Sequence, residues 1–415
     1  MIASFGRSHW TIIREWFQDT SSKFGQVWST NEGSDCFYAL DVLLHLAGVP
    51  NELTSKWRWE STVRYFLHAL YAFQTVIAFL QTKHVIERDN VFDLFVEVMK
   101  WTFFIVAYFK MFIMIRLGRS VAAVRKFIAG KEMQSGDAAF DELQRMKFKR
   151  SALFLLRILF VLMVMDAIFL SVPSGATAIV FFVPPEMKSA GPTATVIIHF
   201  FGISLMPFLI LCKFSCNMAT VGMLLMGMQA NIKILANRYV KILDKSFDTE
   251  HHLEQLDREV RSAVDQQMEY WRHLHILRNL VEKTFFLVHY YAIFSIGGFY
   301  YITQNIGVNA FSALLMATTP IFLVEYYLWC NLVESIQNEA ETIGDVMYEL
   351  CAKMPYNREK HSAYVRLKSN KLILWINSCN IRAMKCLGLF DISTLAFVDL
   401  VNVSYSVLMF LINMS

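Results

Sequence analysis

The stretch that decides the fold covers residues 194–226, ATVIIHFFGISLMPFLILCKFSCNMATVGMLLM. A helix needs roughly 20 mostly apolar residues to cross the hydrocarbon core of a bilayer, which is about 30 Å thick. This stretch is longer than that and almost continuously apolar, so it predicts a transmembrane helix. We expect a kink near Pro207, because proline has no N–H to donate and its ring disturbs the preceding turn.

Six further stretches of the chain have the same length and character. They are residues 63–86, 91–117, 151–175, 280–303, 309–335 and 390–413. Of the 415 residues, 55% are hydrophobic and 18% charged, whereas an average soluble domain has about 25% charged residues. We therefore predict an all-α membrane protein with seven transmembrane helices in a single domain, 1–415. The formal net charge of +4 gives no reason to expect nucleic acid as a partner.

Basic residues gather on one side of this predicted topology. Lys and Arg number nine in residues 116–150, nine in 227–283 and eight in 336–389, and further ones lie in the N-terminal segment. The other side has only Lys83, Arg88 and Lys188. Because loops rich in Lys and Arg stay in the cytoplasm, we expect a cytoplasmic N-terminus and an extracellular C-terminus. That orientation excludes a G-protein-coupled receptor, and we see no internal repeat of the kind found in secondary transporters.

Several cytoplasmic segments are predicted to be helical. The N-terminal segment 1–60 contains an amphipathic helix at 36–46, which Gly48 and Pro50 end. Residues 227–283 and 336–389 have apolar side chains every three or four positions, as at Leu256, Val260 and Val264. We interpret them as long cytoplasmic helical extensions, and the candidates for what they pack against are one another and a neighbouring subunit. The alternative is that they lie on the inner leaflet.

The C-terminal third carries a more specific pattern. In order, it has Cys330, Tyr348, Leu387-Gly388-Leu389-Phe390, Phe397 and Ser404-Tyr405-Ser406. With the span count and inverted topology, this pattern resembles the insect odorant receptor family. The 227–283 connection lacks the insertion of the family's obligate co-receptor, so the chain resembles an odour-tuned subunit, with a composition typical of a dipteran member.

This resemblance implies an odorant-gated, non-selective cation channel in the cell membrane of a sensory neuron dendrite. It implies a heterotetramer with the co-receptor, in which the seventh helices (390–413) line a shared pore and the helical extensions 227–283 and 336–389 form an anchor region between subunits. It also implies a small volatile ligand in the outer half of the bundle. The alternative is a gustatory-receptor-type cation channel. In that sister family the last helix ends with Tyr, five apolar residues and Gln-Phe, whereas here Leu411 stands at the Gln position.

The resemblance places the ligand among the second to sixth spans, where aromatic and Met side chains are frequent. Such side chains hold small ligands by shape and dispersion, although each could equally be bundle core or face lipid. The candidates are Met99, Phe103, Phe104, Met165, Ile168, Phe169, Val172, His199, Phe200, Ile203, Met206, Thr318, Phe322 and Tyr326. We found no motif for a catalytic site, a metal site or a cofactor, and expect none.

In the last span, Tyr405, Leu408 and Ile412 share one helical face. Because the gate in this family lies just beyond that Tyr, we expect these three residues to form this chain's share of a hydrophobic gate. Charged residues inside spans are costly and need partners. Glu97 and Lys100 are spaced to pair. Asp166 and Glu325 lie deeper in their spans, and Asp166 could face the pocket or a water-filled vestibule.

Overall fold

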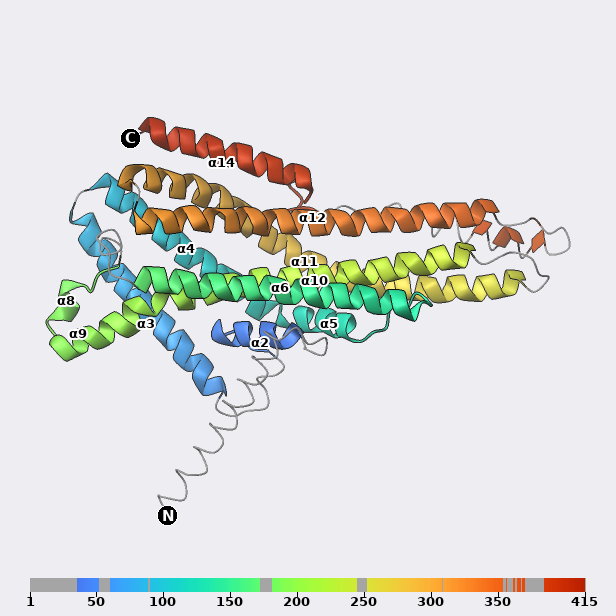
Figure 1. The fold of residues 1–415 in the computed structure, drawn as a ribbon, viewed down its shortest axis with the longest axis horizontal. Coiled ribbons are helices and arrows are strands. Elements are labelled where there is room, and N and C mark those ends of the chain that lie inside the picture. Colours follow the sequence, from blue (N-terminus) through green and yellow to red (C-terminus); the bar gives the residue numbers. More distant parts are fainter. Residues whose placement is uncertain are drawn as a thin grey trace, which may run out of the picture.

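A computed structural model describes residues 36–51, 60–88, 90–171, 181–244, 252–307, 309–353, 356, 361–362, 364–366, 368–369 and 384–414. Within them every regular element is a helix (Figure 1). In chain order these are α2 (Cys36–Leu46), α3 (Glu60–Ile86), α4 (Val91–Arg116), α5 (Gly118–Ala129), α6 (Ala138–Ser171), α8 (Pro185–Lys188), α9 (Pro192–Ile198), the π-helix η2 (His199–Ser204), α10 (Met206–Asp244), α11 (His252–Ile306), α12 (Ala310–Lys353) and α14 (Thr394–Met414). The predicted segment 1–60 and extension 336–389 lie partly outside these residues.

Helix α10 forms the centre of the bundle. It packs on α2, α4, α6, α11 and α12, and most of its residues are buried. A helix surrounded by others must be apolar on all sides rather than along one stripe. This explains why residues 206–226 are so uniformly apolar, whereas Val196, Ile197, Phe200 and Phe201 of the same stretch are exposed on the bundle surface.

The predicted spans coincide with helices. Five described helices are long and apolar enough to cross a membrane, with limits Ser61–Ile86, Val91–Arg116, Pro192–Asp244, Gln255–Ile306 and Thr394–Asn413. The third predicted span falls in α6 as far as Ser171, where this described segment ends, and the sixth falls in α12 from Ala310 onward. The chain is therefore an all-α protein with several membrane-spanning-type helices, while the count of seven and the orientation remain predictions.

The helix break expected at Pro207 lies just before that residue. Residues His199–Ser204 form a π-helix, and the Leu205 amide donates to the Phe200 carbonyl at 3.0 Å, five residues back. Pro207 has no N–H to continue an α-helical ladder to Ile203, so the widened turn adapts the chain to the proline. Gly202 allows α3 to approach this turn, because a Cβ at that position would clash with Ile77.

Three helices extend well beyond the length of a bilayer crossing. Helices α10, α11 and α12 have 39, 55 and 44 residues, and 55 residues at about 1.5 Å each span about 80 Å. They pack on one another and continue together past the other helices (Figure 1). The helical character predicted for residues 227–283 is confirmed in the described part.

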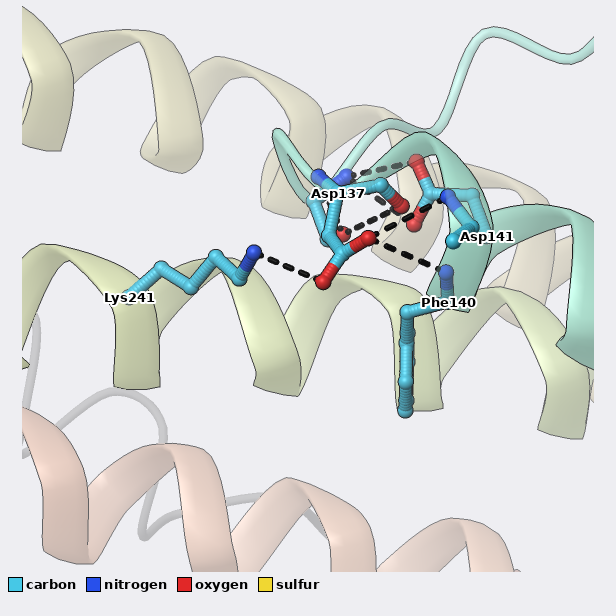
Figure 2. Close-up of polar contacts among 6 residues, drawn as sticks. Asp137, Phe140, Asp141 and Lys241 are labelled. Atoms are coloured by element: carbon cyan, nitrogen blue, oxygen red, sulfur yellow. Dashed lines mark hydrogen bonds and ion pairs between the residues drawn. The ribbon is translucent and has the colours of Figure 1, made fainter.

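A capping network fixes the start of α6. Asp137 Oδ1 accepts from the Ala139 and Phe140 amides at 3.1 and 3.2 Å, and its Oδ2 accepts from Lys241 Nζ on α10 at 2.8 Å (Figure 2). Asp141 Oδ2 accepts from the Ser135 amide at 3.0 Å. The first turn of α6 is thereby capped and tied to α10. The Lys241 hydrogen bond lowers the pKa of Asp137.

The last helix begins at Thr394, four residues later than the predicted 390. Leu387 and Gly388 have φ of 47° and 81°, in the left-handed region, and form a turn that is closed by hydrogen bonds between Cys386 and Phe390 and between Ile392 and Met384. The Thr394 amide donates to Glu334 Oε2 of α12 at 3.1 Å. The apolar character of Phe390 and Ile392 extended the predicted helix over what is a turn.

Candidate functional site

An apolar cavity lies inside the bundle between α4, α6, α10, α11 and α12. Its volume is about 170 Å³. Apolar cavities of about 150 Å³ in other proteins remain dry and bind benzene-sized guests. The lining residues are Val96, Met99, Lys100, Phe103, Phe104, Leu159, Leu162, Met163, Phe181, Met206, Pro207, Ile210, Leu211, Phe214, Ser215, Met218, Phe299, Ile302, Leu315, Thr318, Ile321 and Phe322.

Aromatic rings form one wall of this cavity. Phe214 of α10 stacks on Phe103 of α4 at 5.1 Å between ring centroids and meets Phe322 of α12 edge-on at 5.8 Å. Phe322 also contacts Phe299 of α11 at 6.0 Å. Four helices therefore meet through one set of interlocking rings, which favours a defined shape over a deformable one.

One charged side chain, Lys100, contributes to the lining. Its Nζ donates to Glu97 Oε1 at 2.7 Å and to Gln81 Oε1 of α3 at 3.1 Å. Thr82 Oγ1 donates to Glu97 Oε2 at 2.9 Å. The pairing predicted for Glu97 and Lys100 is confirmed, and the network leaves the buried charge compensated at the cavity wall.

A second buried ion pair lies beside the aromatic wall. Lys110 Nζ of α4 is 3.2 Å from Glu325 Oε1 of α12 and 3.5 Å from the ring centroid of Phe214, and both charged side chains are fully buried. Glu325 thus has a partner that the sequence analysis did not identify. Because these residues are 215 positions apart, no local spacing could have indicated the pair.

Six of the predicted ligand-binding residues line the cavity. They are Met99, Phe103, Phe104, Met206, Thr318 and Phe322. The structure therefore brings together the predicted residues of α4, α10 and α12. Sequence reasoning omitted Phe214 and Met218, although both fall inside the stretch 194–226.

The other predicted residues lie elsewhere or outside the description. Met165, Ile168 and Phe200 are exposed on the bundle surface. His199 contacts Ser204 at 3.3 Å, Ile203 packs with Ile77 and Val183, and the Tyr326 hydroxyl contacts His289 Nδ1 at 2.8 Å. The side chains of Phe169, Val172 and Asp166 are outside the described part of the structure.

Helix α14 packs on α11 and α12 by one face and leaves the other open. Leu400 and Ser404 are buried, whereas Asp399, Asn402 and Ser406 are exposed. These three follow at spacings of three and four, so they form a polar stripe on the outward face. Of the predicted gate residues, Tyr405 is exposed, while Leu408 and Ile412 are half-buried.

Comparison with known proteins identifies the fold of this chain. No family model matches the sequence, and no curated protein matches it. Among solved structures, the insect olfactory receptor OR5 from Machilis hrabei superimposes with a TM-score of 0.68 at 8% identity, over 91% of this chain and 97% of that one. The same receptor in complex with eugenol gives a TM-score of 0.68 at 10% identity over the same shares. The chain is an all-α membrane protein, and its fold is that of this insect olfactory receptor.

Proposed function

We propose that this chain is a ligand-gated cation channel subunit of the insect odorant receptor family and binds a small volatile in the apolar cavity. The observation that carries the proposal is an apolar cavity between the helices of a chain that shares the OR5 fold over nearly its whole length. The OR5 structure with eugenol supports a small volatile as the ligand of this fold. The cavity volume favours ligands near the size of a single substituted ring.

The outward face of α14 supports the proposed channel function. Its polar stripe faces away from the bundle, and a helix in a bilayer keeps such a stripe only against water or other protein. Four such helices around a common axis would form a cation path in which Tyr405, Leu408 and Ile412 face the axis, while the polar stripe contacts water or the neighbouring helix. The co-receptor supplies the other subunits of this heterotetramer, in the cell membrane of a sensory dendrite.

The decisive experiment is current recording from cells that express this chain with and without a co-receptor, across a panel of volatiles and sugars. We expect volatile-evoked cation current only with the co-receptor. Current from the chain alone would contradict the hetero-oligomer, and responses to sugars but not volatiles would favour the gustatory alternative. No current to any compound, with normal surface delivery, would overturn the proposed function.

The gate has its own test. Leu408→Ser and Ile412→Ser add polarity to an apolar constriction, which wets more readily as a result. We expect higher basal current or altered cation permeability with an unchanged ranking of odorants. Unchanged leak combined with a reordered odorant panel would assign these residues to ligand binding instead. Ile105→Ser, exposed on α4 and outside α14, is the control.

A further inference from the structure

A second, larger hollow runs along the outside of the bundle between α6, α10 and α12. Its volume is about 600 Å³. It begins beside Gln144, Lys147 and Lys233, and reaches Leu162 and Pro320 at mid-bundle. Residues 144 to 162 of α6 cover about 27 Å at 1.5 Å per residue. We call it the lateral groove.

The lateral groove and the inner cavity share one wall. Leu159, Leu162, Met218 and Ile321 line both. These four side chains therefore lie between the outer hollow and the inner one. Leu and Met side chains change rotamer readily, and Met is flexible enough to leave and refill such a gap.

The groove faces the side of the bundle that lipid would cover. Phe154, Ile158 and Val324 line it and are 63%, 40% and 58% exposed. Helices α6 and α12 both pack extensively on α10 but only slightly on each other. The two helices can therefore part without losing their main contacts.

Helix α12 is weakened at this point. Pro320 lies inside the helix and lines the groove. It cannot donate to the Met316 carbonyl, so one backbone hydrogen bond is missing one residue before the shared wall residue Ile321. A local opening of α12 costs less here than elsewhere along it.

We propose that the ligand reaches the inner cavity laterally from the bilayer, through the lateral groove and past the shared wall. This inference rests on the proposed function, because it concerns how the ligand of that cavity arrives. An apolar volatile partitions from water into hydrocarbon, so the bilayer presents it at high local concentration beside the groove. The groove is the access route, and the inner cavity is the binding site.

The test narrows the groove without touching the cavity. Val324→Trp and Ile158→Trp place a large ring in the groove, and neither residue lines the inner cavity. The matched control is Ile105→Trp on α4, which is 49% exposed and lines neither hollow. Association and dissociation are measured on the complex of this chain with its co-receptor, purified in nanodiscs, with the tightest binder among benzaldehyde, acetophenone and 2-heptanone.

A barrier on the only path slows entry and exit alike, so the equilibrium constant is unchanged. We expect both rates to fall roughly three- to tenfold in the groove variants, with the affinity unaltered and the control like wild type. Val324→Ala widens the groove and should increase both the association and the dissociation rate. This variant tests the route even if a Trp variant does not fold. Wild-type rates in folded Val324→Trp, Ile158→Trp and Val324→Ala would overturn the route.

The two proposals fail in different ways. A wild-type chain that binds none of the three probes would overturn the proposed function and the route with it. Binding at wild-type rates in the groove variants would remove the lateral route alone and indicate entry from the extracellular face. A changed affinity with an unchanged association rate would show that the groove residues stabilise the bound ligand and do not limit its entry. That result also contradicts the route.

Discussion

At the residue scale, the aromatic wall is where the cavity makes its most specific contacts. Phe322→Ala removes a ring that meets Phe214 and Phe299 and lines the cavity. The lost contact should weaken ligand binding by roughly 1–3 kcal/mol, a 5- to 150-fold rise in half-maximal concentration. Phe109→Ala on the outer face of α4, 54% exposed, is the control and should leave the dose response in place.

That experiment separates a binding defect from a folding defect. The Phe322 variant should still open to an agonist that acts on the co-receptor subunits. Loss of both responses would show misfolding, and an unshifted dose response would remove Phe322 from the binding site.

The buried pair Lys110–Glu325 allows a second residue-scale prediction. Lys110→Met leaves the Glu325 carboxylate buried beside Phe214 without its cation. Removing one partner of a buried pair costs about 3–5 kcal/mol, whereas replacing both by apolar residues is often neutral. We expect a clear fall in Tm for the single variant and recovery in Lys110→Met/Glu325→Leu. A double variant as unstable as the single one would mean that the pair contributes more than charge compensation.

Residues of this kind also mark the limit of sequence reasoning. Lys213 is fully buried in α10, donates to the Ala47 carbonyl at the end of α2 at 2.8 Å, and lies 4.7 Å from the ring centroid of Tyr71. Its partners, which include Met111 Sδ of α4, lie far from position 213 in the chain and carry no sequence signal near it. The pair Glu97–Lys100, three residues apart on one helix, could be predicted because its geometry is local.

At the element scale, helix positions followed from apolar length, while helix ends depended on contacts. At the start of α6, the helix cap and the ion pair with Lys241 are both made by Asp137, and substitutions can remove them separately. Asp137→Asn keeps a good N-cap but loses the ion pair with Lys241, and Asp137→Ala loses both. We expect Tm to fall in the order wild type, Asn, Ala. Equal Tm values for all three in thermal denaturation would contradict a role for this cap.

The ion pair of Asp137 also predicts that thermal stability depends on pH. The pKa of Asp137 is lowered by the Lys241 hydrogen bond from the ordinary value of 3.8. A lowered pKa means that the stabilisation is present above pH 3.8, where the unfolded chain is also ionised, and is lost as the pH falls through the folded-state value. The Tm difference between wild type and Asp137→Asn should therefore shrink below pH 3.8. A difference that stays constant to lower pH would refute the ionic contribution.

Helices α11 and α14 approach closely at Gly297. A Cβ there would lie 2.9 Å from Val407 Cγ1, closer than real contacts allow. Gly297→Leu should displace α14, so we expect altered basal current with unchanged ligand affinity, as measured by patch clamp and by direct binding. Gly118→Ala is the control, since a Cβ at Gly118 meets nothing within 4 Å. A loss of ligand affinity without any change in basal current would show that the contact between Gly297 and α14 does not influence channel opening.

At the scale of the whole molecule, the fold class could be predicted because bilayer-length apolar stretches are visible without any partner. Six of the predicted ligand residues converge on one cavity, since the family resemblance indicated the right helices. It could not indicate which face of each helix turns inward, so Met165, Ile168 and Phe200 lie on the surface. In a bilayer both faces of a helix are apolar, and the periodicity that separates inside from outside in a soluble protein is weak.

Orientation is the whole-molecule property on which the proposed function most depends. Helices α8 and α9 and the C-terminal end of α14 lie at one end of the bundle, opposite the far ends of α10, α11 and α12 (Figure 1). The basic clusters in residues 116–150 and 227–283 belong to the second end, whereas Lys188 stands alone in α8 at the first. Because short loops rich in Lys and Arg are retained in the cytoplasm, the second end should be cytoplasmic.

Epitope tags test this orientation directly. A tag at Met1, or one inserted in the exposed turn at Gly130–Lys131, should bind antibody only after permeabilisation. A tag after Ser415, or one inserted at the exposed Ala190 beside α8, should bind on intact cells. Two tags on each side guard against a single insertion that misfolds. The reverse pattern would place the C-terminus in the cytoplasm, and the proposed receptor-channel function would then fail, because the long ends of α10, α11 and α12 would project outside the cell.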